Sequence, residues 1–337
     1  MKVIYSPDHI YHDPKTHMYD SAFHPHPDSL KRVEVILKTL KSLSIKPNKV
    51  KTTVPESILY KIHDRNYIKF LEQICKTIKA DEEFFPEMFN HNVRNVSEIS
   101  LLQAKLGFYC KDTYTPVGNG TYKASIAAAS VAYEAAVYLR KSKNRFVYAV
   151  CRGSGHHAER AYMCGYCYIN NEAIAAEHLS QFGKVAILDI DFHHFNGTQS
   201  IFYSRDDVFT VSVHIDTKFD FPFYGGTKSE KGEAKGKGFN LNLPLNKNIG
   251  IEKYMQTLNF ALKKIHKFDP EYLIVILGFD THKNDMAGGF GLKTDNYRKI
   301  GRVISNAEYP TLFVQSGGYN TSILGEALGE FINGLSA

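Results

Sequence analysis

Apolar residues form five short, nearly continuous runs along the chain, and these runs alternate with longer stretches of helical periodicity. The runs predict strands at 145–151, 184–190, 208–214, 272–278 and 311–316, and residues 2–6 predict a further short strand. Apolar positions three and four residues apart predict helices at 29–43, 56–79, 121–142, 170–182, 197–204, 250–267, 294–307 and 321–334. Continuous apolar strands between helices are typical of a parallel sheet covered on both faces, so we expect one α/β domain over residues 1–337.

Two stretches lack this periodicity. Residues 7–28 are rich in His, Pro and Asp, and we expect a loop there. Residues 80–100 combine several Asp and Glu side chains with apolar ones in an otherwise basic chain, and they predict a long, partly structured surface loop. Loops of that length in compact domains are often functional.

Composition narrows the function classes. The chain has 337 residues and a net charge of +6, but acidic residues and glycines interrupt its basic run at 228–237, so we expect no nucleic-acid binding. No secretory signal and no membrane-spanning apolar stretch are visible. The five Cys are odd in number and sparse, which suits a reducing compartment and predicts a cytoplasmic protein. Cys164 and Cys167 match a redox C-x-x-C motif but lack the thioredoxin-like setting.

Polar residues gather directly after four of the predicted strands. In open parallel sheets, sites form beyond the carboxyl ends of the strands, so these residues are expected to meet in one site. They are His156 and His157 after 145–151, Asp189, Asp191 and His193 at the end of 184–190, Asp280 after 272–278, and Tyr319 after 311–316.

Asp191, His193 and Asp280 are the predicted metal ligands. Side chains two residues apart in an extended chain share a face, and catalytic zinc commonly takes three protein ligands. His157 would be the base that removes a proton from water, and Tyr319, behind two glycines, would polarise a carbonyl. The alternatives are a turn that only satisfies backbone groups, a structural His pair and a packed aromatic ring.

Together these residues resemble the zinc-dependent deacetylase family, which includes histone deacetylases and acetylpolyamine amidohydrolases. The matching segments are Gly155–Ala158, Gly165–Asn171, Asp189–Gln199, Gly278–Asp280 and Gly317–Tyr319. The resemblance implies the arginase/deacetylase α/β fold, with a central, mostly parallel sheet of about eight strands and helices on both faces. It also implies a deacetylase that uses one catalytic zinc ion per chain.

The resemblance assigns roles around the zinc. His157 becomes the general base, and Asn196 orients it. His156 becomes the electrostatic partner of His157 and is itself oriented by Asp189. Tyr319 becomes the group that polarises the carbonyl. A neutral amide at Asn196 favours the imidazolium of His157 less than a carboxylate would, which leaves His157 readier to act as a neutral base.

The resemblance also implies a substrate tunnel and a second ion. Gly165, Tyr166 and Phe221 would line a tunnel of acyl-lysine size, with both rings flanking the methylene chain. A structural potassium ion would be held by Asp189, Ser212 and backbone carbonyl groups at positions 191 and 193.

The insertion at about 80–110 looks most like acetylpolyamine amidohydrolases, where a similar insertion supports a homodimer and narrows the mouth of the site. A small cationic acetylated amine is therefore the expected substrate. Two positions depart from this pattern: Ala287 stands where the polyamine-specific relative carries a gatekeeper Glu, and Gln103 stands where an acidic residue is expected. Amine recognition would then fall to other acids, such as Glu87 or Glu98.

Three other functions remain open. The nearest is a lysine deacylase acting on acylated proteins or peptides. A binuclear manganese ureohydrolase would share the fold but would need more bridging carboxylates. A non-catalytic small-molecule binding protein would not need the complete set of ligands, base and phenol.

Overall fold

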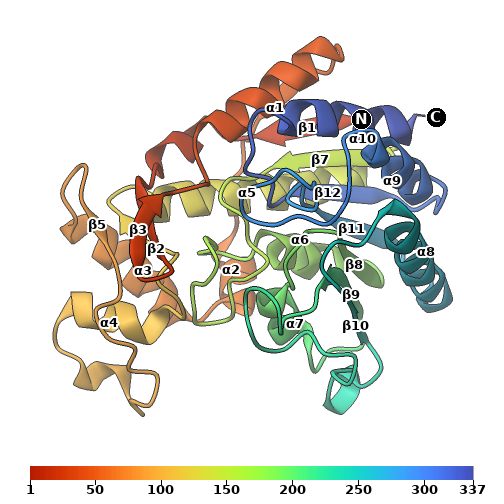
Figure 1. Cartoon of the computed structure of the whole chain (residues 1–337). Coiled ribbons are helices and arrows are strands. Elements are labelled where there is room, and N and C mark those ends of the chain that lie inside the picture. The colour runs from red at the N-terminus through yellow and green to blue at the C-terminus, as the bar shows by residue number, and fades with distance from the viewer. Residues whose placement is uncertain (337) are drawn as a thin grey trace.

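Eight strands form the central sheet of the structure, a computed structural model that describes residues 1–336 (Figure 1). The strands are β1 (Lys2–Tyr5), β4 (Pro47–Lys49), β7 (Phe146–Val150), β8 (Val185–Asp189), β9 (Val208–Ile215), β10 (Asn240–Leu245), β11 (Tyr272–Leu277) and β12 (Thr311–Gln315). Their order is β10-β9-β8-β11-β12-β7-β1-β4, and all neighbours run parallel. The expected α/β sheet is therefore confirmed, and it is fully rather than mostly parallel.

Helices cover both faces of this sheet because alternate strand residues point in opposite directions. Ile187 of β8 packs in the core beneath α2, α3, α5, α6 and α7, while Ala186 and Leu188 pack in the core beneath α1, α8, α9 and α10. The helix bounds are α1 (Lys31–Ser42), α2 (Glu56–Ile62), α3 (Arg65–Thr77), α5 (Thr121–Lys141), α6 (Asn171–Leu179), α7 (Asn196–Phe202), α8 (Ile251–Phe268), α9 (Asn296–Ser305) and α10 (Leu324–Leu335). Within residues 1–336, no helix combines the length and the apolarity needed to cross a membrane.

The single helix expected at 56–79 is wrong, because the chain breaks between α2 and α3. His63 and Asp64 are extended there, and the Asp64 side chain caps α3 by accepting from the backbone N–H groups of Asn66 and Tyr67. His63 in turn accepts a hydrogen bond at Nε2 from the backbone N–H of Asn170, at 2.9 Å. Tertiary bonding and a local cap therefore override a continuous helical period.

Residues 7–28, expected to be a loop, contain a short 3-10 helix (Pro7–Tyr11) and an antiparallel hairpin of β2 (Thr16–Tyr19) and β3 (Ala22–Pro25). Asp20 and Ser21 form the turn with φ of 49° and 61°. Two successive left-handed residues give the twist that a two-residue hairpin needs. His17 lies directly opposite His24 in this hairpin. The dense His and Pro content concealed the strand signal.

Residues 80–100 are partly structured, as expected, and a helix follows them. β5 (Glu83–Phe84) pairs with β6 (Val117–Gly118), and a 3-10 helix (Val96–Glu98) and α4 (Leu102–Tyr109) follow β5. Glu83 accepts hydrogen bonds from the backbone N–H of Thr16, at 3.2 Å, and from its hydroxyl, at 3.0 Å. The acidic segment is therefore attached to the first strand of the hairpin.

The strands that the hydrophobic pattern did not predict include β4 and β10, the two edges of the sheet. β10 alternates Asn and Leu, and the side-chain amides of Asn240 and Asn242 both donate to Gln199. β4 begins with a proline, which edge strands tolerate. Polar or proline-containing edge strands do not produce the long apolar run of a central strand.

Candidate active site

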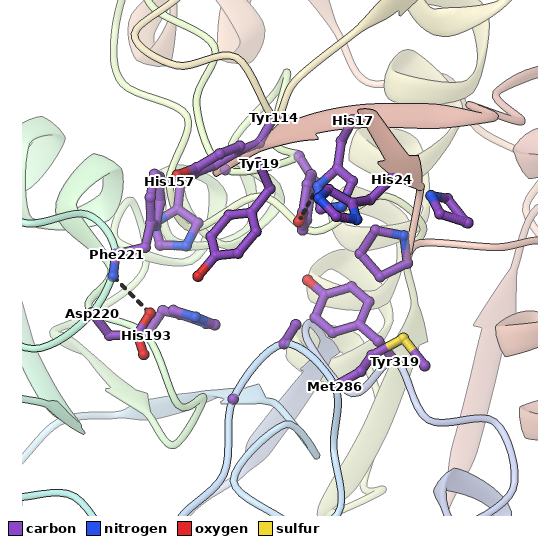
Figure 2. Close-up of a pocket in the computed structure, with 16 residues that line it drawn as sticks. His17, Tyr19, His24, Tyr114, His157, His193, Asp220, Phe221, Met286 and Tyr319 are labelled. Carbon is purple, nitrogen blue, oxygen red and sulfur yellow. Dashed lines mark hydrogen bonds between the residues drawn. The ribbon is translucent and has the colours of Figure 1, made fainter. Parts of the chain in front are cut away.

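The loops that follow five of the parallel strands meet at one edge of the sheet, where they surround a cavity of about 510 Å³. The loops follow β7, β8, β9, β11 and β12, and the β2–β3 hairpin closes the opposite side (Figure 2). The lining residues include His157, Gly165, Tyr166, His193, Asp220, Phe221 and Tyr319. This volume suits a small-molecule site, and it lies where the predicted polar clusters converge.

Asp191, His193 and Asp280 each place one donor atom within 4.8 Å of the others. The Nδ1 atom of His193 lies 3.2 Å from Oδ2 of Asp280 and 3.4 Å from Oδ1 of Asp191. In a tetrahedral zinc site with bonds of about 2.0–2.1 Å, neighbouring donor atoms lie about 3.3 Å apart. Both the spacing and the oxygen–nitrogen donor set fit a zinc-sized cation.

Backbone groups and glycines hold the two carboxylates in place. Asp191 accepts from the backbone N–H groups of His193, at 3.0 Å, and Gly317, at 2.7 Å. A Cβ atom at Gly278 would lie 2.4 Å from Oδ2 of Asp191, and one at Gly317 would lie 2.3 Å from Oδ2 of Asp280. Side chains at these two positions would therefore displace the donors, which explains the glycines beside both motifs.

The carboxylates of Asp191 and Asp280 are almost completely buried. Burial and the neighbouring Asp191 raise the pKa of Asp280 to about 8. Two adjacent buried carboxylates resist ionising together unless a cation compensates them. The electrostatics of the donor set therefore favour a bound divalent ion, in agreement with its geometry.

His157 is held by Asn196, whose Oδ1 lies 2.7 Å from Nδ1 of His157. The Nδ2 atom of Asn196 lies 3.3 Å from a carboxylate oxygen of Glu159. A carboxylate only accepts, so the amide nitrogen faces Glu159 and the amide oxygen faces His157. Nδ1 of His157 therefore carries the proton and Nε2 has the lone pair. Burial and the neighbouring His156 lower the pKa of His157 well below its usual value, which keeps it neutral.

His156 is in the opposite state. Its Nδ1 lies 3.0 Å from Oδ2 of Asp189, and its ring centroid is 4.0 Å from that of His157. Burial works against ionisation, but the carboxylates of Asp191 and Asp189 outweigh it and raise the pKa of His156 to about 9. A cationic imidazole therefore stands beside a neutral one.

Tyr319 follows a glycine pair and points into the cavity (Figure 2). Gly318 has a φ of 105°, a conformation that glycine readily adopts. The backbone N–H of Tyr319 donates to Asp285 at 2.7 Å, and the guanidinium of Arg32 lies 4.6 Å from the ring centroid. Burial raises the pKa of the phenol well above its usual value, so the O–H remains available as a donor.

Gly165, Tyr166 and Phe221 form the wall between the donors and solvent. Gly165 has a φ of 55°, and a Cβ there would lie 2.3 Å from the His157 ring and 2.8 Å from the Phe221 ring. The Phe221 ring stands edge-on to His157, with centroids 4.9 Å apart. The Tyr166 hydroxyl is 3.0 Å from Nδ1 of His17. An aromatic channel therefore leads to the buried histidines.

Asp189 and Ser212 do not line the cavity. They are register partners on β8 and β9, and both are completely buried. Asp189 accepts from the backbone N–H of Asp191 at 2.9 Å, and the Ser212 hydroxyl is 2.7 Å from Nδ1 of His214.

The acids considered for amine recognition lie elsewhere. Glu87 and Glu98 are exposed, and no residue of the range 80–110 lines the cavity within this chain. Gln103 is also exposed outside the cavity, whereas Ala287 lines it. In this chain the opening of the cavity, its mouth, is narrowed by the β2–β3 hairpin and not by the insertion at 80–110.

Several lining residues were not identified from the sequence. They are His17, Tyr19 and His24 of the hairpin, together with Tyr114, Asp220 and Met286. The spacing of His17 and Tyr19 by two residues, as on one strand face, was the available signal. Asp220 directly precedes Phe221, which was identified, but nothing in its local pattern marked it as part of the cavity.

Comparison with known proteins gives a consistent assignment. The histone deacetylase domain family matches residues 26–335. Acetylpolyamine amidohydrolase 1 of Pseudomonas aeruginosa is 34% identical over 335 residues, covering 96% of each chain. The acetylpolyamine amidohydrolase of Mycoplana ramosa is 32% identical over 341 residues, covering 100% of each chain. The solved acetylpolyamine aminohydrolase from Burkholderia pseudomallei matches with a TM-score of 0.95 and 30% identity, over 100% of this chain and 99% of that one. The expected fold is thereby confirmed, and the chain belongs to the histone deacetylase family.

Proposed function

We propose that this protein is a zinc-dependent amidohydrolase that removes acetyl groups from acetylated polyamines. One observation carries the proposal: one cavity with aromatic walls is lined by His157, by the phenol of Tyr319 and by His193, which is one member of the three-donor group. Family membership supports deacetylation, and full-length similarity to enzymes named for acetylpolyamines supports the substrate class. Asp191, His193 and Asp280 would hold the zinc ion.

A zinc ion at this site would polarise the acetyl carbonyl and make a water molecule more acidic. His157 would take the proton of that water at Nε2, since Asn196 fixes its other nitrogen as a donor. Tyr319 would donate its O–H to the carbonyl oxygen as negative charge develops there. His157 would then return the proton to the departing amine. The positive charge of His156 would stabilise the negative charge that develops on the carbonyl oxygen. Tyr166, Phe221 and Gly165 would hold the methylene chain.

Comparison of two substrates tests this function. The zinc-loaded protein should hydrolyse N-acetylputrescine with a higher kcat/KM than an acetyl-lysine peptide. Preference for the peptide would instead establish the lysine deacylase. Elemental analysis should find one zinc ion per chain, whereas two manganese ions would indicate a ureohydrolase. Failure of every acetylated substrate despite bound zinc would favour a binding protein.

We also propose that Asp189 and Ser212, with nearby backbone carbonyls, hold a structural potassium ion. Their burial and their adjacent register positions support this role. Replacing potassium by tetramethylammonium in the buffer should lower the melting temperature, while a Ser212→Ala variant should respond less. Equal stability in both buffers would contradict the site.

We further propose one deacetylase domain that dimerises through the insertion at 80–110. Met88, Phe89 and Leu101 support this, because their side chains are 71%, 45% and 69% exposed. Met88→Glu with Leu101→Glu should convert a dimer into a monomer in sedimentation, and a wild-type monomer would contradict the proposal.

All five cysteines are buried and free, which supports the reducing cytoplasm as the location.

A further inference from the structure

Asp220 carries a charge that the proposed chemistry does not use. Among the described residues that line the cavity, it is the one carboxylate, and none of them is Lys or Arg. We propose that Asp220 binds the free ammonium group of the substrate and selects acetylated diamines that carry a single such group. This inference rests on the proposed function and names the substrate class within it.

The side chain of Asp220 is fixed at the cavity wall. It lies in the loop after β9, immediately before Phe221, and its Oδ1 accepts from the backbone N–H of Phe221 at 2.9 Å (Figure 2). Within residues 1–336, no donor reaches its other carboxylate oxygen. Phe221 packs edge-on to His157, so Asp220 belongs to the same wall as the base. A substrate whose methylene chain passes Phe221 would therefore pass Asp220.

No cation of the described residues neutralises this carboxylate. Across residues 1–336, Asp220 forms no ion pair. Lys218, two positions earlier, pairs with Asp216 at 3.0 Å. Lys111 pairs with Glu159 at 2.7 Å. The ammonium group of a substrate would not have to displace a cationic side chain from Asp220. The electrostatic attraction between the ammonium group and Asp220 would therefore not be offset by the loss of an existing ion pair.

Among the described residues of this chain, no other side chain that lines the cavity supplies a negative charge. The polar side chains of the mouth include Tyr19, Tyr114, His17 and His24, which are neutral or become cationic on protonation. A second ammonium group drawn into this space would lose hydration without gaining a counter-charge, which is costly. One carboxylate therefore favours one ammonium group, as in N-acetylputrescine. It disfavours acetylated triamines and longer polyamines.

Three acetamides of different charge test the inference. kcat/KM would be measured for N-butylacetamide, N-acetylputrescine and N8-acetylspermidine, which carry zero, one and two ammonium groups. The zinc-loaded wild type should prefer N-acetylputrescine to both others. In Asp220→Asn the preference for N-acetylputrescine over N-butylacetamide should fall roughly ten- to a hundredfold. This range corresponds to the free energy of a hydrogen bond to a charged group. Asp220→Glu keeps the charge and should retain most of the preference.

The outcomes separate the possible failures. An unchanged substrate ratio in Asp220→Asn would overturn the inference, as would an equal loss for charged and neutral substrates, which would mean that Asp220 only positions Phe221. Wild type preferring N8-acetylspermidine would overturn the selection for one charge. If wild type hydrolysed acetyl-lysine peptides but no acetylated diamine, the proposed function itself would fail, and that result does not depend on any variant. Loss of folding in Asp220→Asn would leave Asp220→Glu to decide, because loss of the preference there would contradict a role based on charge.

Discussion

The buried end of the cavity and its mouth are constructed in different ways. At the buried end, Asp191 and Asp280 are almost fully buried and follow central strands, and backbone N–H groups hold both. At the mouth, Tyr19 is 54% exposed and Met286 is 69% exposed, and both belong to a hairpin or a loop outside the central sheet. Rigid, dry surroundings strengthen the electrostatic interactions that the chemistry needs. The mouth is open to solvent, and its proposed role is to select the substrate.

Removal of a metal ligand should have the largest effect. His193→Ala loses the nitrogen donor and leaves two adjacent buried carboxylates without it. We expect less than one zinc ion per chain and a fall in kcat/KM of at least roughly a thousandfold. His24→Ala, at the mouth, is the matched control and should retain zinc and most of the activity. Metal analysis and steady-state kinetics measure both variants. Substantial activity in zinc-depleted His193→Ala would contradict the assignment of this ligand.

Loss of the phenol should have the next largest effect. Tyr319→Phe keeps the ring beside Arg32 but removes the proposed donor to the carbonyl oxygen, so kcat should fall roughly a hundred- to a thousandfold. Tyr166→Phe removes a phenol from the same cavity whose partner is His17 rather than the reacting carbonyl, and its kcat should change only a few-fold. A loss of only a few-fold in both variants would mean that the phenol O–H of Tyr319 does not stabilise the carbonyl oxygen.

A charge placed beside the base should shift the pH profile. Asn196→Asp would put a carboxylate next to Nδ1 of His157 and raise its pKa. The base must be neutral, so the acid limb of kcat/KM should move to higher pH, by about one unit, with roughly tenfold less activity on that limb. Asn196→Ala removes the hydrogen bond without adding charge and should lower activity without that shift. A pH–rate profile decides, and an unmoved acid limb in Asn196→Asp would indicate that another group limits the rate there.

The sequence predicts the two ends of the cavity to different extents. The central strands are continuous apolar runs, so their carboxyl ends, and with them Asp191, Asp280 and His157, could be located from the pattern alone. The parallel arrangement then brings those ends to one edge. The roles of these residues came from the chemistry of their side chains and from family resemblance.

The mouth could not be derived in the same way. The hairpin at Thr16–Pro25 combines His, Pro and polar residues, and its register depends on a left-handed turn at Asp20 and Ser21. Asp220 reaches the cavity through the course of a loop, which no periodic pattern encodes. Glu87 and Glu98 of the acidic segment were expected to recognise the amine, but both lie outside the cavity of this chain, and Glu83 of the same segment binds the hairpin backbone. Contacts between distant loops were therefore the part that sequence reasoning missed.

Removal of the contact between Glu83 and the hairpin should have the smallest effect. It also tests most directly whether the buried end and the mouth of the cavity behave differently. Glu83→Ala removes the acceptor that bonds both backbone and hydroxyl of Thr16, so the hairpin should become more mobile while the buried donors stay in place. We expect KM for N-acetylputrescine to rise roughly two- to fivefold with kcat nearly unchanged, because the hydrogen bonds that are lost, from Thr16 and from the backbone N–H of Lys15, are at least partly exposed. Hydrogen exchange should accelerate at residues 16–25 and not at β8. Glu82→Ala removes the neighbouring carboxylate, which pairs with Lys79 instead, and should leave both readouts unchanged. A fall in kcat with Glu83→Ala would mean that the hairpin also fixes the reacting groups, and the separation between a rigid chemical end and an adjustable mouth would not hold.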